Sequence, residues 1–147
     1  MTGIAPHGGT LINRELEGKA REEAKARAKS LTALTLSDRE VCDLEMIAVG
    51  AMSPLEGFMA KVDYESCLAR KRLANGLPWT IPVTKSITKE EKSKISRAKE
   101  AVLTDARGNG LAILEIQDIF PHTWNVINLQ HRQYRQRESV NHAPCYS

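Results

Sequence analysis

The first residues whose types and spacing could do chemistry are His7, Gly8 and Gly9. Two successive glycines permit positive φ angles and close approach of a ligand to the backbone. An imidazole beside such amides could therefore line a groove in which an anion meets backbone N–H groups. The alternative is that Pro6 to Gly9 form a tight turn, docked on the fold or on another domain. One histidine without a partner is rarely a catalytic centre.

The second candidate anion site is the basic run Arg70, Lys71 and Arg72, to which Lys61 could contribute. Such a cluster could face phosphate or RNA. The same cations would also complement the dipole at the end of a helix that the sequence predicts over residues 64–73. The residues leave both interpretations open.

Two further patterns that could bind nucleotides also have structural explanations. Residues 108–110, Gly-Asn-Gly, lack the Lys-Ser/Thr pair that follows in a phosphate-binding Walker loop, so they predict a turn. Phe58 and Trp79 could stack on bases, but aromatic residues between apolar neighbours are more often part of a core.

Composition indicates one globular domain. The 147 residues are 41% hydrophobic and 27% charged, which suffices for one core but not for two. Only +1 of the formal charge of +3 lies in residues 1–120, so we expect no nucleic-acid partner. Cys42, Cys67 and Cys145 lack the CxxC spacing of a metal site. Without a membrane span or a signal peptide, the sequence predicts a cytoplasmic protein with reduced thiols.

The most strongly specified stretch is residues 34–59, LTLSDREVCDLEMIAVGAMSPLEGFM. It predicts two capping boxes, Ser37 with Glu40 and Ser53 with Glu56. The first box opens a helix with one apolar face, which Gly50 ends in the left-handed conformation. The second box predicts a single helical turn.

The other segments must pack against this helix. We expect a loop over residues 4–12, a helix over 13–30, a helix capped by Asp63 over 64–73 and an edge strand over 77–86. A capping box of Thr88 with Glu91 then opens a helix towards Ile95, and strands 101–104 and 111–119 form a hairpin. The last strand has the most regular apolar pattern and should be the most buried. From residue 121 the pattern is lost, so we expect an organised domain over 1–120 and a divergent, disordered C-terminal tail over 121–147.

Four stretches resemble the N-terminal domain of the ATP sulfurylase (sulfate adenylyltransferase) family. They are IAPHGGTLINRELEG at 4–18, the stretch at 34–59, DYESCLARKRLANGLPWTIPVT at 63–84 and LAILEIQDIF at 111–120. Together they span residues 4–120 in order and with matching spacings. The resemblance implies an α+β fold, a PUA-like small mixed β-barrel with flanking helices, packed against a separate catalytic domain.

The family makes adenylyl sulfate and pyrophosphate from ATP and sulfate, and its catalytic domain uses ATP and Mg²⁺. The family motifs Gln-x-Arg-Asn-Pro, His-x-x-His and Gly-Arg-Asp-His-Ala do not occur in this sequence. Gln130-His131-Arg132 matches only the first three positions of the first motif. It also lies too close to the end of the predicted domain to be that motif. The resemblance therefore implies a chain truncated before the catalytic domain. It would have no catalytic, cofactor or metal residues of its own and would be inactive alone.

Three hypotheses follow from this departure. The chain could be a scaffold domain whose partner is a sulfurylase catalytic domain or a full-length sulfurylase. It could instead be a stand-alone PUA-like module that binds RNA or protein. The tail from residue 121 could be out-of-frame sequence or the end of a truncated gene product.

Overall fold

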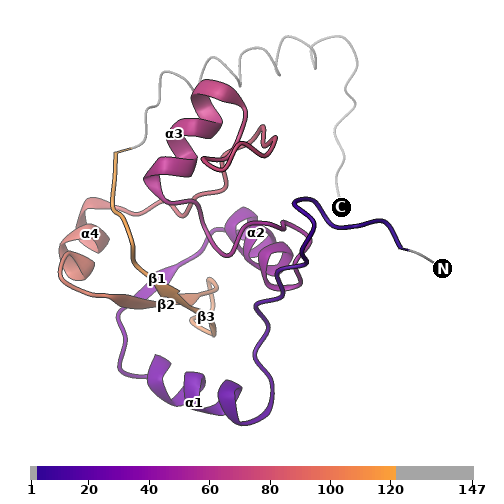
Figure 1. Cartoon of the computed structure of the whole chain (residues 1–147). Helices are drawn as coiled ribbons and strands as arrows, with labels where there is room; N and C mark the ends of the chain where they lie inside the picture. The colour runs from indigo at the N-terminus through magenta and orange to yellow at the C-terminus, as the bar shows by residue number, and fades with distance from the viewer. Residues whose placement is uncertain (1–2, 122–147) are drawn as a thin grey trace, which may run out of the picture.

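The computed structural model describes residues 3–121. Its elements are, in order, α1 (Gly18–Ala28), β1 (Ala33–Thr35), α2 (Asp38–Ala48), α3 (Lys61–Arg70), α4 (Lys89–Ile95), β2 (Glu100–Thr104) and β3 (Gly110–Glu115). The sheet lies at the centre of Figure 1, with α1 below it, α4 to the left, α2 to the right and α3 at the top. The tail expected after the domain falls, from residue 122 onward, outside the described residues.

The strands within residues 3–121 form one open sheet in the order β1-β2-β3. β1 runs parallel to β2, with Leu34 opposite Leu103, and β3 runs antiparallel to β2. The predicted hairpin and the α+β class are confirmed. The described strands do not close into the barrel that the resemblance implied.

The segment expected as an edge strand, residues 77–86, has no regular ladder in the described part of the chain. It makes isolated backbone bonds instead, from Trp79 N to Lys71 O and from Met59 N to Val83 O. Two of its residues, Pro78 and Pro82, lack the N–H that a continuous ladder needs.

The expectation that the last strand is the most buried is wrong. Residues 101–104 of β2 are all buried, whereas β3 is half-buried or exposed along its length. The reason is position in the sheet, since β2 lies between two neighbours and β3 forms an edge.

Helix α2 connects the two hydrophobic clusters of the described residues. Ile47 packs into a cluster with α3 and the loops around it, while Val41 and Leu44 pack against a second cluster built on the sheet. Phe58 is half-buried and contacts both clusters. The Ser37–Glu40 capping box is formed as predicted, and so is the box of Thr88 with Glu91 on α4.

The second box of the central stretch is not formed. Ser53 Oγ donates to Gly50 O at 2.6 Å and accepts from Ile12 N at 2.9 Å, so it is not available to cap a helix. Residues 51–54 form turns in place of the expected helical turn. Gly50 has φ +81°, as the predicted helix end requires.

Two helices begin at other residues than expected. α1 starts at Gly18 and not near residue 13, because Arg14 N donates to Ala48 O and ties the preceding segment, which has no regular structure, to the end of α2. α3 starts at Lys61, and Asp63 accepts from Ala74 N at 2.8 Å in place of capping the helix. In residues 3–121 every helix is too short or too polar to cross a bilayer.

Candidate functional site

The glycine turn near the N-terminus is tight and local. Gly9 N donates to Pro6 O at 2.8 Å, and Gly8 and Gly9 have φ angles of +80° and +85°. These angles favour glycine, because a Cβ would be strained there. The predicted turn over Pro6 to Gly9 is therefore confirmed.

His7 connects this turn to the segment that follows α3. Its Nε2 lies 2.9 Å from Pro78 O, and its ring centroid is 6.1 Å from that of Trp79. A Cβ added to Gly8 would lie 3.1 Å from Leu77 and 3.2 Å from Pro54. The turn therefore packs closely on the rest of the fold. This agrees with the interpretation of Pro6 to Gly9 as a docked turn. The described contacts of Arg70, Lys71 and Arg72 are with residues other than Pro6 to Gly9, so the two candidate anion sites do not combine into one.

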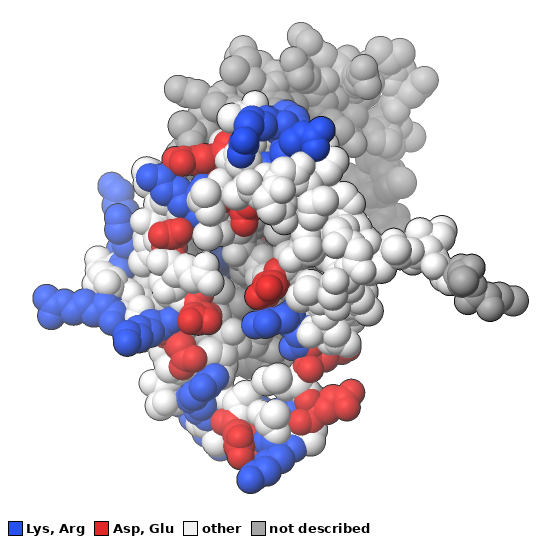
Figure 2. Space-filling view, viewed as in Figure 1, with Lys and Arg blue, Asp and Glu red and all other residues white. Residues whose placement is uncertain are grey.

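The basic run Arg70, Lys71 and Arg72 lies at the C-terminal end of α3, where Figure 2 shows Lys and Arg gathered at the top of the described part of the molecule. Arg70 Nη2 donates to Ser66 Oγ at 2.7 Å, and Arg72 Nη1 donates to Gly76 O at 2.8 Å.

Two more contacts complete this end of the helix. Lys71 ends α3 with φ +56°, and its Nζ lies 3.5 Å from Leu68 O. Ser66 Oγ in turn donates to Arg72 O at 2.7 Å. The carbonyl groups that Lys71 and Arg72 contact belong to the end of the helix and to the turn after it, which fits the dipole interpretation. Lys61 lies at the other end of α3 and pairs with Glu65 at 3.8 Å, so it does not join the run.

Sequence reasoning did not anticipate the full role of Glu40. Its Oε1 accepts from Ser86 N at 2.8 Å, its Oε2 accepts from Ser37 N at 2.9 Å, and Lys85 Nζ lies 3.5 Å from Oε2. Burial by itself would raise the pKa of Glu40, but the amides of Ser37 and Ser86, with Lys85, hold that pKa below its ordinary value. The sequence signals the cap alone, because the other partners are distant along the chain.

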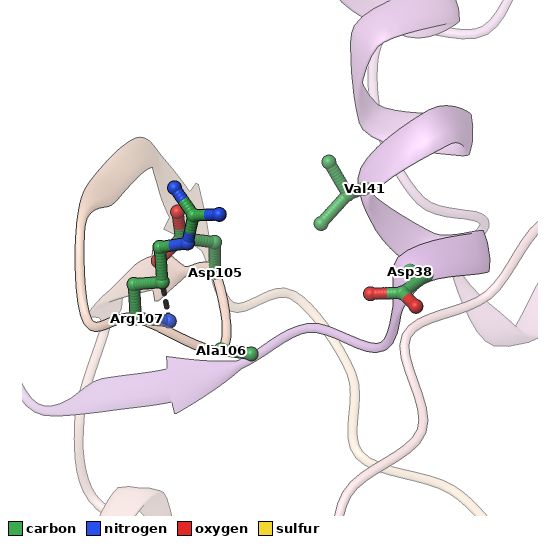
Figure 3. A pocket seen from close by; sticks show the side chains of 5 residues that line it. All are labelled: Asp38, Val41, Asp105, Ala106 and Arg107. Carbon is green, nitrogen blue, oxygen red and sulfur yellow. Dashed lines mark hydrogen bonds between the residues drawn. The ribbon is translucent and has the colours of Figure 1, made fainter.

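A hollow of about 250 Å³ lies between the start of α2 and the β2–β3 turn (Figure 3). It is lined by Asp38, Val41, Asp105, Ala106 and Arg107. The Asp105 carboxylate is used by its own turn, since it accepts from Arg107 N and from both nitrogens of Asn109 at 2.8–2.9 Å. The side-chain and backbone bonds from Asn109 lower the pKa of Asp105. The β2–β3 connection turns at residues 105–108, where Gly108 N donates to Asp105 O at 3.0 Å, and Gly110 of the expected turn is already the first residue of β3.

Metal and thiol chemistry have little support in the described part of the chain. Residues 3–121 contain no group of three or more His, Cys, Asp or Glu side chains placed to hold a metal ion. Cys67 is fully buried, and desolvation raises the pKa of its thiol. Cys42 is exposed on α2.

Comparison with known proteins identifies the domain. Residues 4–144 match the family model described as PUA-like domain. The sulfate adenylyltransferase of Symbiobacterium thermophilum is 46% identical over 121 residues, which cover 82% of this chain and 31% of that protein. The sulfate adenylyltransferase of Synechococcus elongatus is 41% identical over 138 residues, 94% of this chain and 34% of that protein. Both the family match and the latter alignment extend past residue 120, the expected domain boundary.

A solved structure is also similar to this chain. The structure described as hexameric APS kinase from Thiobacillus denitrificans has a TM-score of 0.69 and 32% identity, covering 82% of this chain and 24% of that one. The chain spans about a third of the length of the curated relatives it matches. It belongs to the PUA-like domain family and corresponds to the N-terminal PUA-like domain of sulfate adenylyltransferases.

Proposed function

We propose that this chain serves as the N-terminal scaffold domain of a cytoplasmic sulfate adenylyltransferase, an enzyme that makes adenylyl sulfate and pyrophosphate from ATP and sulfate. The observation that carries the proposal is the 46% identity with the Symbiobacterium enzyme over 121 residues. The partner of the domain is then a sulfurylase catalytic domain, and about two-thirds of the relatives' length lies outside the part that this chain matches.

The described residues support a structural role over a catalytic one. Adenylyl transfer brings two anions together, so the protein must supply converging cations and amide donors, with Mg²⁺ on the departing pyrophosphate. Within residues 3–121, His7, Arg70 and Arg72 contact groups of the fold itself. The metal-ligating residue types do not gather there either. These residues do not fit an ATP–Mg²⁺ site, and we assign both ligands to the catalytic domain.

Sulfate-dependent ATP–pyrophosphate exchange tests this function in two proteins. The chain alone should show no exchange above a blank. A chimera in which residues 1–121 replace the matched segment of the Symbiobacterium enzyme should keep exchange within about tenfold of that enzyme. Exchange by the chain alone that survives rigorous removal of host enzyme would overturn the scaffold role. A folded chimera without exchange would overturn the assignment to this enzyme.

A further inference from the structure

Residues 3–121 contain two Asn-Gly dipeptides, Asn75-Gly76 and Asn109-Gly110, and both are exposed. An asparagine before glycine can lose its side-chain amide without an enzyme, because no side chain on the next residue hinders attack by its backbone nitrogen. Dipeptide sequence and exposure are the same at the two positions. A difference in their reactivity must therefore come from the hydrogen bonds and charges around them.

The side chain of Asn75 is folded over the peptide that would attack it. Its Oδ1 accepts from Leu77 N at 3.0 Å, which closes a ring that includes the nitrogen of Gly76. The same N–H donor would stabilise the negative oxygen that forms when this nitrogen adds to Cγ of Asn75. No described atom lies within 4 Å of a Cβ added to Gly76, so the turn is also open to water.

A cation lies beside this turn, in the loop that follows α3. Arg72 Nη1 donates to Gly76 O at 2.8 Å. Its positive charge favours loss of the proton from Gly76 N, the step that makes this nitrogen a nucleophile. One contact opposes the reaction, since Gly76 N donates to Leu73 O at 2.9 Å and must leave this bond before it attacks. A single hydrogen bond in an exposed turn is a small obstacle.

The second dipeptide has the opposite surroundings. Asn109 Nδ2 donates to Asp105 Oδ2 at 2.8 Å, and Asn109 N donates to Asp105 Oδ1 at 2.8 Å. The carboxamide of Asn109 is therefore fixed on this carboxylate and not on the peptide of Gly110. The negative charge of Asp105 also opposes the loss of a proton from a nearby amide.

We propose that Asn75 is a modification site at which the chain deamidates spontaneously, whereas Asp105 protects Asn109. Gly76 N, having lost its proton, forms a bond to Cγ of Asn75, and Nδ2 takes up a proton and leaves as ammonia. Water then opens the resulting succinimide at either carbonyl, which leaves aspartate or isoaspartate at position 75. The reaction consumes only water and needs no oxidant or cofactor.

Isoaspartate at this position opens the turn, because it lengthens the main chain by one carbon atom. Gly76 N donates to Leu73 O, and Leu73 N donates to Leu77 O, both at 2.9 Å, and these bonds need the normal spacing of the chain. Pro78 O, one residue further on, lies 2.9 Å from His7 Nε2. The modification would therefore also loosen the docking of the N-terminal glycine turn.

Incubation of the native chain at mildly alkaline pH, followed by peptide mapping with tandem mass spectrometry, measures both rates. Asn75 should deamidate at least about tenfold faster than Asn109 in the folded chain, and the two rates should agree within about threefold in urea, where these contacts are lost. Asn13 is an internal reference, because its Oδ1 accepts from Glu15 N at 2.8 Å but Arg14 follows it. It should stay unmodified.

The Asp105→Ala variant tests the protection. It should raise the rate at Asn109 towards that at Asn75 and leave the rate at Asn75 unchanged. Equal rates at the two positions in the native chain, or a faster reaction at Asn109, would overturn the proposal. A tenfold difference that persists in urea would overturn it too, because the neighbouring sequence would then explain the selectivity.

Amide hydrogen exchange tests the opening of the turn in chains that carry isoaspartate, separated from the native form by anion exchange. The amides of Leu73 and Gly76 should exchange at least about tenfold faster than in the native chain. The amide of Gly108, which donates to Asp105 O at 3.0 Å, is the control and should be unchanged. Unchanged exchange at all three amides would show that the turn stays closed and would reject this consequence.

Discussion

Ser86 N donates to Glu40 Oε1 at 2.8 Å, which joins two residues 46 positions apart. The same carboxylate accepts from Ser37 at the start of α2 through its other oxygen. Glu40 therefore caps its own helix and also fixes the segment that leads into α4. Its side chain is 12% exposed and that of Lys85 is 7% exposed, so water screens their 3.5 Å contact weakly.

Replacing this carboxylate should destabilise the fold. Glu40→Gln keeps one acceptor oxygen but removes the charge that Ser37, Lys85 and Ser86 face. We expect a loss of about 1–3 kcal/mol in the free energy of unfolding, the usual cost of breaking buried hydrogen bonds to a charged group. Urea unfolding measures it. Glu45→Gln, at an exposed position of the same helix, should cost less than about 0.5 kcal/mol. Equal losses at the two positions would contradict this role of Glu40.

The contribution of Glu40 should also make the free energy of unfolding depend on pH. The pKa of Glu40 is lower in the folded chain than its ordinary value of 4.5. Its contribution is therefore fully present above the unfolded pKa and is lost as pH falls through the folded pKa. Between about pH 7 and about pH 3, the unfolding free energy of the native chain should fall more steeply than that of Glu40→Gln. The other carboxylates are common to both proteins, so parallel curves would exclude the effect.

Gly50 should tolerate substitution poorly for two separable reasons. Its φ is +81°, and a Cβ there would lie 2.8 Å from Ile12 O and from Leu11 Cδ1. Gly76 has a similar φ of +89°, but no described atom lies within 4 Å of its Cβ position. Gly76→Ala thus measures the backbone strain alone, about 1 kcal/mol, and Gly50→Ala should cost at least about 1 kcal/mol more. Thermal and urea unfolding of both variants would test this. Equal losses in the free energy of unfolding would show that Leu11 and Ile12 move to accommodate the added Cβ.

The features that could be predicted from the sequence depend on residues close together in the chain. Each formed capping box needs only a hydroxyl and a carboxylate three residues apart. The boxes of Ser37 with Glu40 and of Thr88 with Glu91 could therefore be predicted from the sequence. The glycine turn at His7 is equally local. The partner of His7, Pro78 O, lies 71 residues away, and no local pattern specifies it.

Several of the wrong predictions fail because of contacts that local spacing does not specify. Ser53 has the spacing of a cap, but Ile12 N and Gly50 O occupy its hydroxyl. The segment before α1 has helical composition, but the bond from Arg14 N to Ala48 O ties it to α2. Relative burial of two strands also depends on sheet order, which alternation within one strand does not reveal. Sequence reasoning therefore placed the elements better than it placed the contacts between them.

The basic run offers the last prediction, because its two interpretations differ in their response to sulfate. If Arg70 and Arg72 stabilise the end of α3, their contacts with Ser66 and Gly76 are complete without an anion. Removing the bond to Gly76 by Arg72→Ala should then lower stability by about 0.5–1.5 kcal/mol, independently of sulfate. Lys92→Ala, at an exposed position on α4, is the matched control and should change stability little.

A sulfate titration followed by thermal unfolding makes the distinction. An anion site would raise the unfolding temperature with a saturable dependence on sulfate, since binding to the folded state stabilises it by RT ln(1 + [L]/Kd). That increase would be lost in Arg72→Ala. We expect the native chain, Arg72→Ala and Lys92→Ala to respond to sulfate in parallel, as they would to a salt that is excluded from the protein surface. A saturable response of the native chain and of Lys92→Ala that is missing in Arg72→Ala would favour the anion-binding interpretation, with Arg72, just after α3, as a contact of the anion.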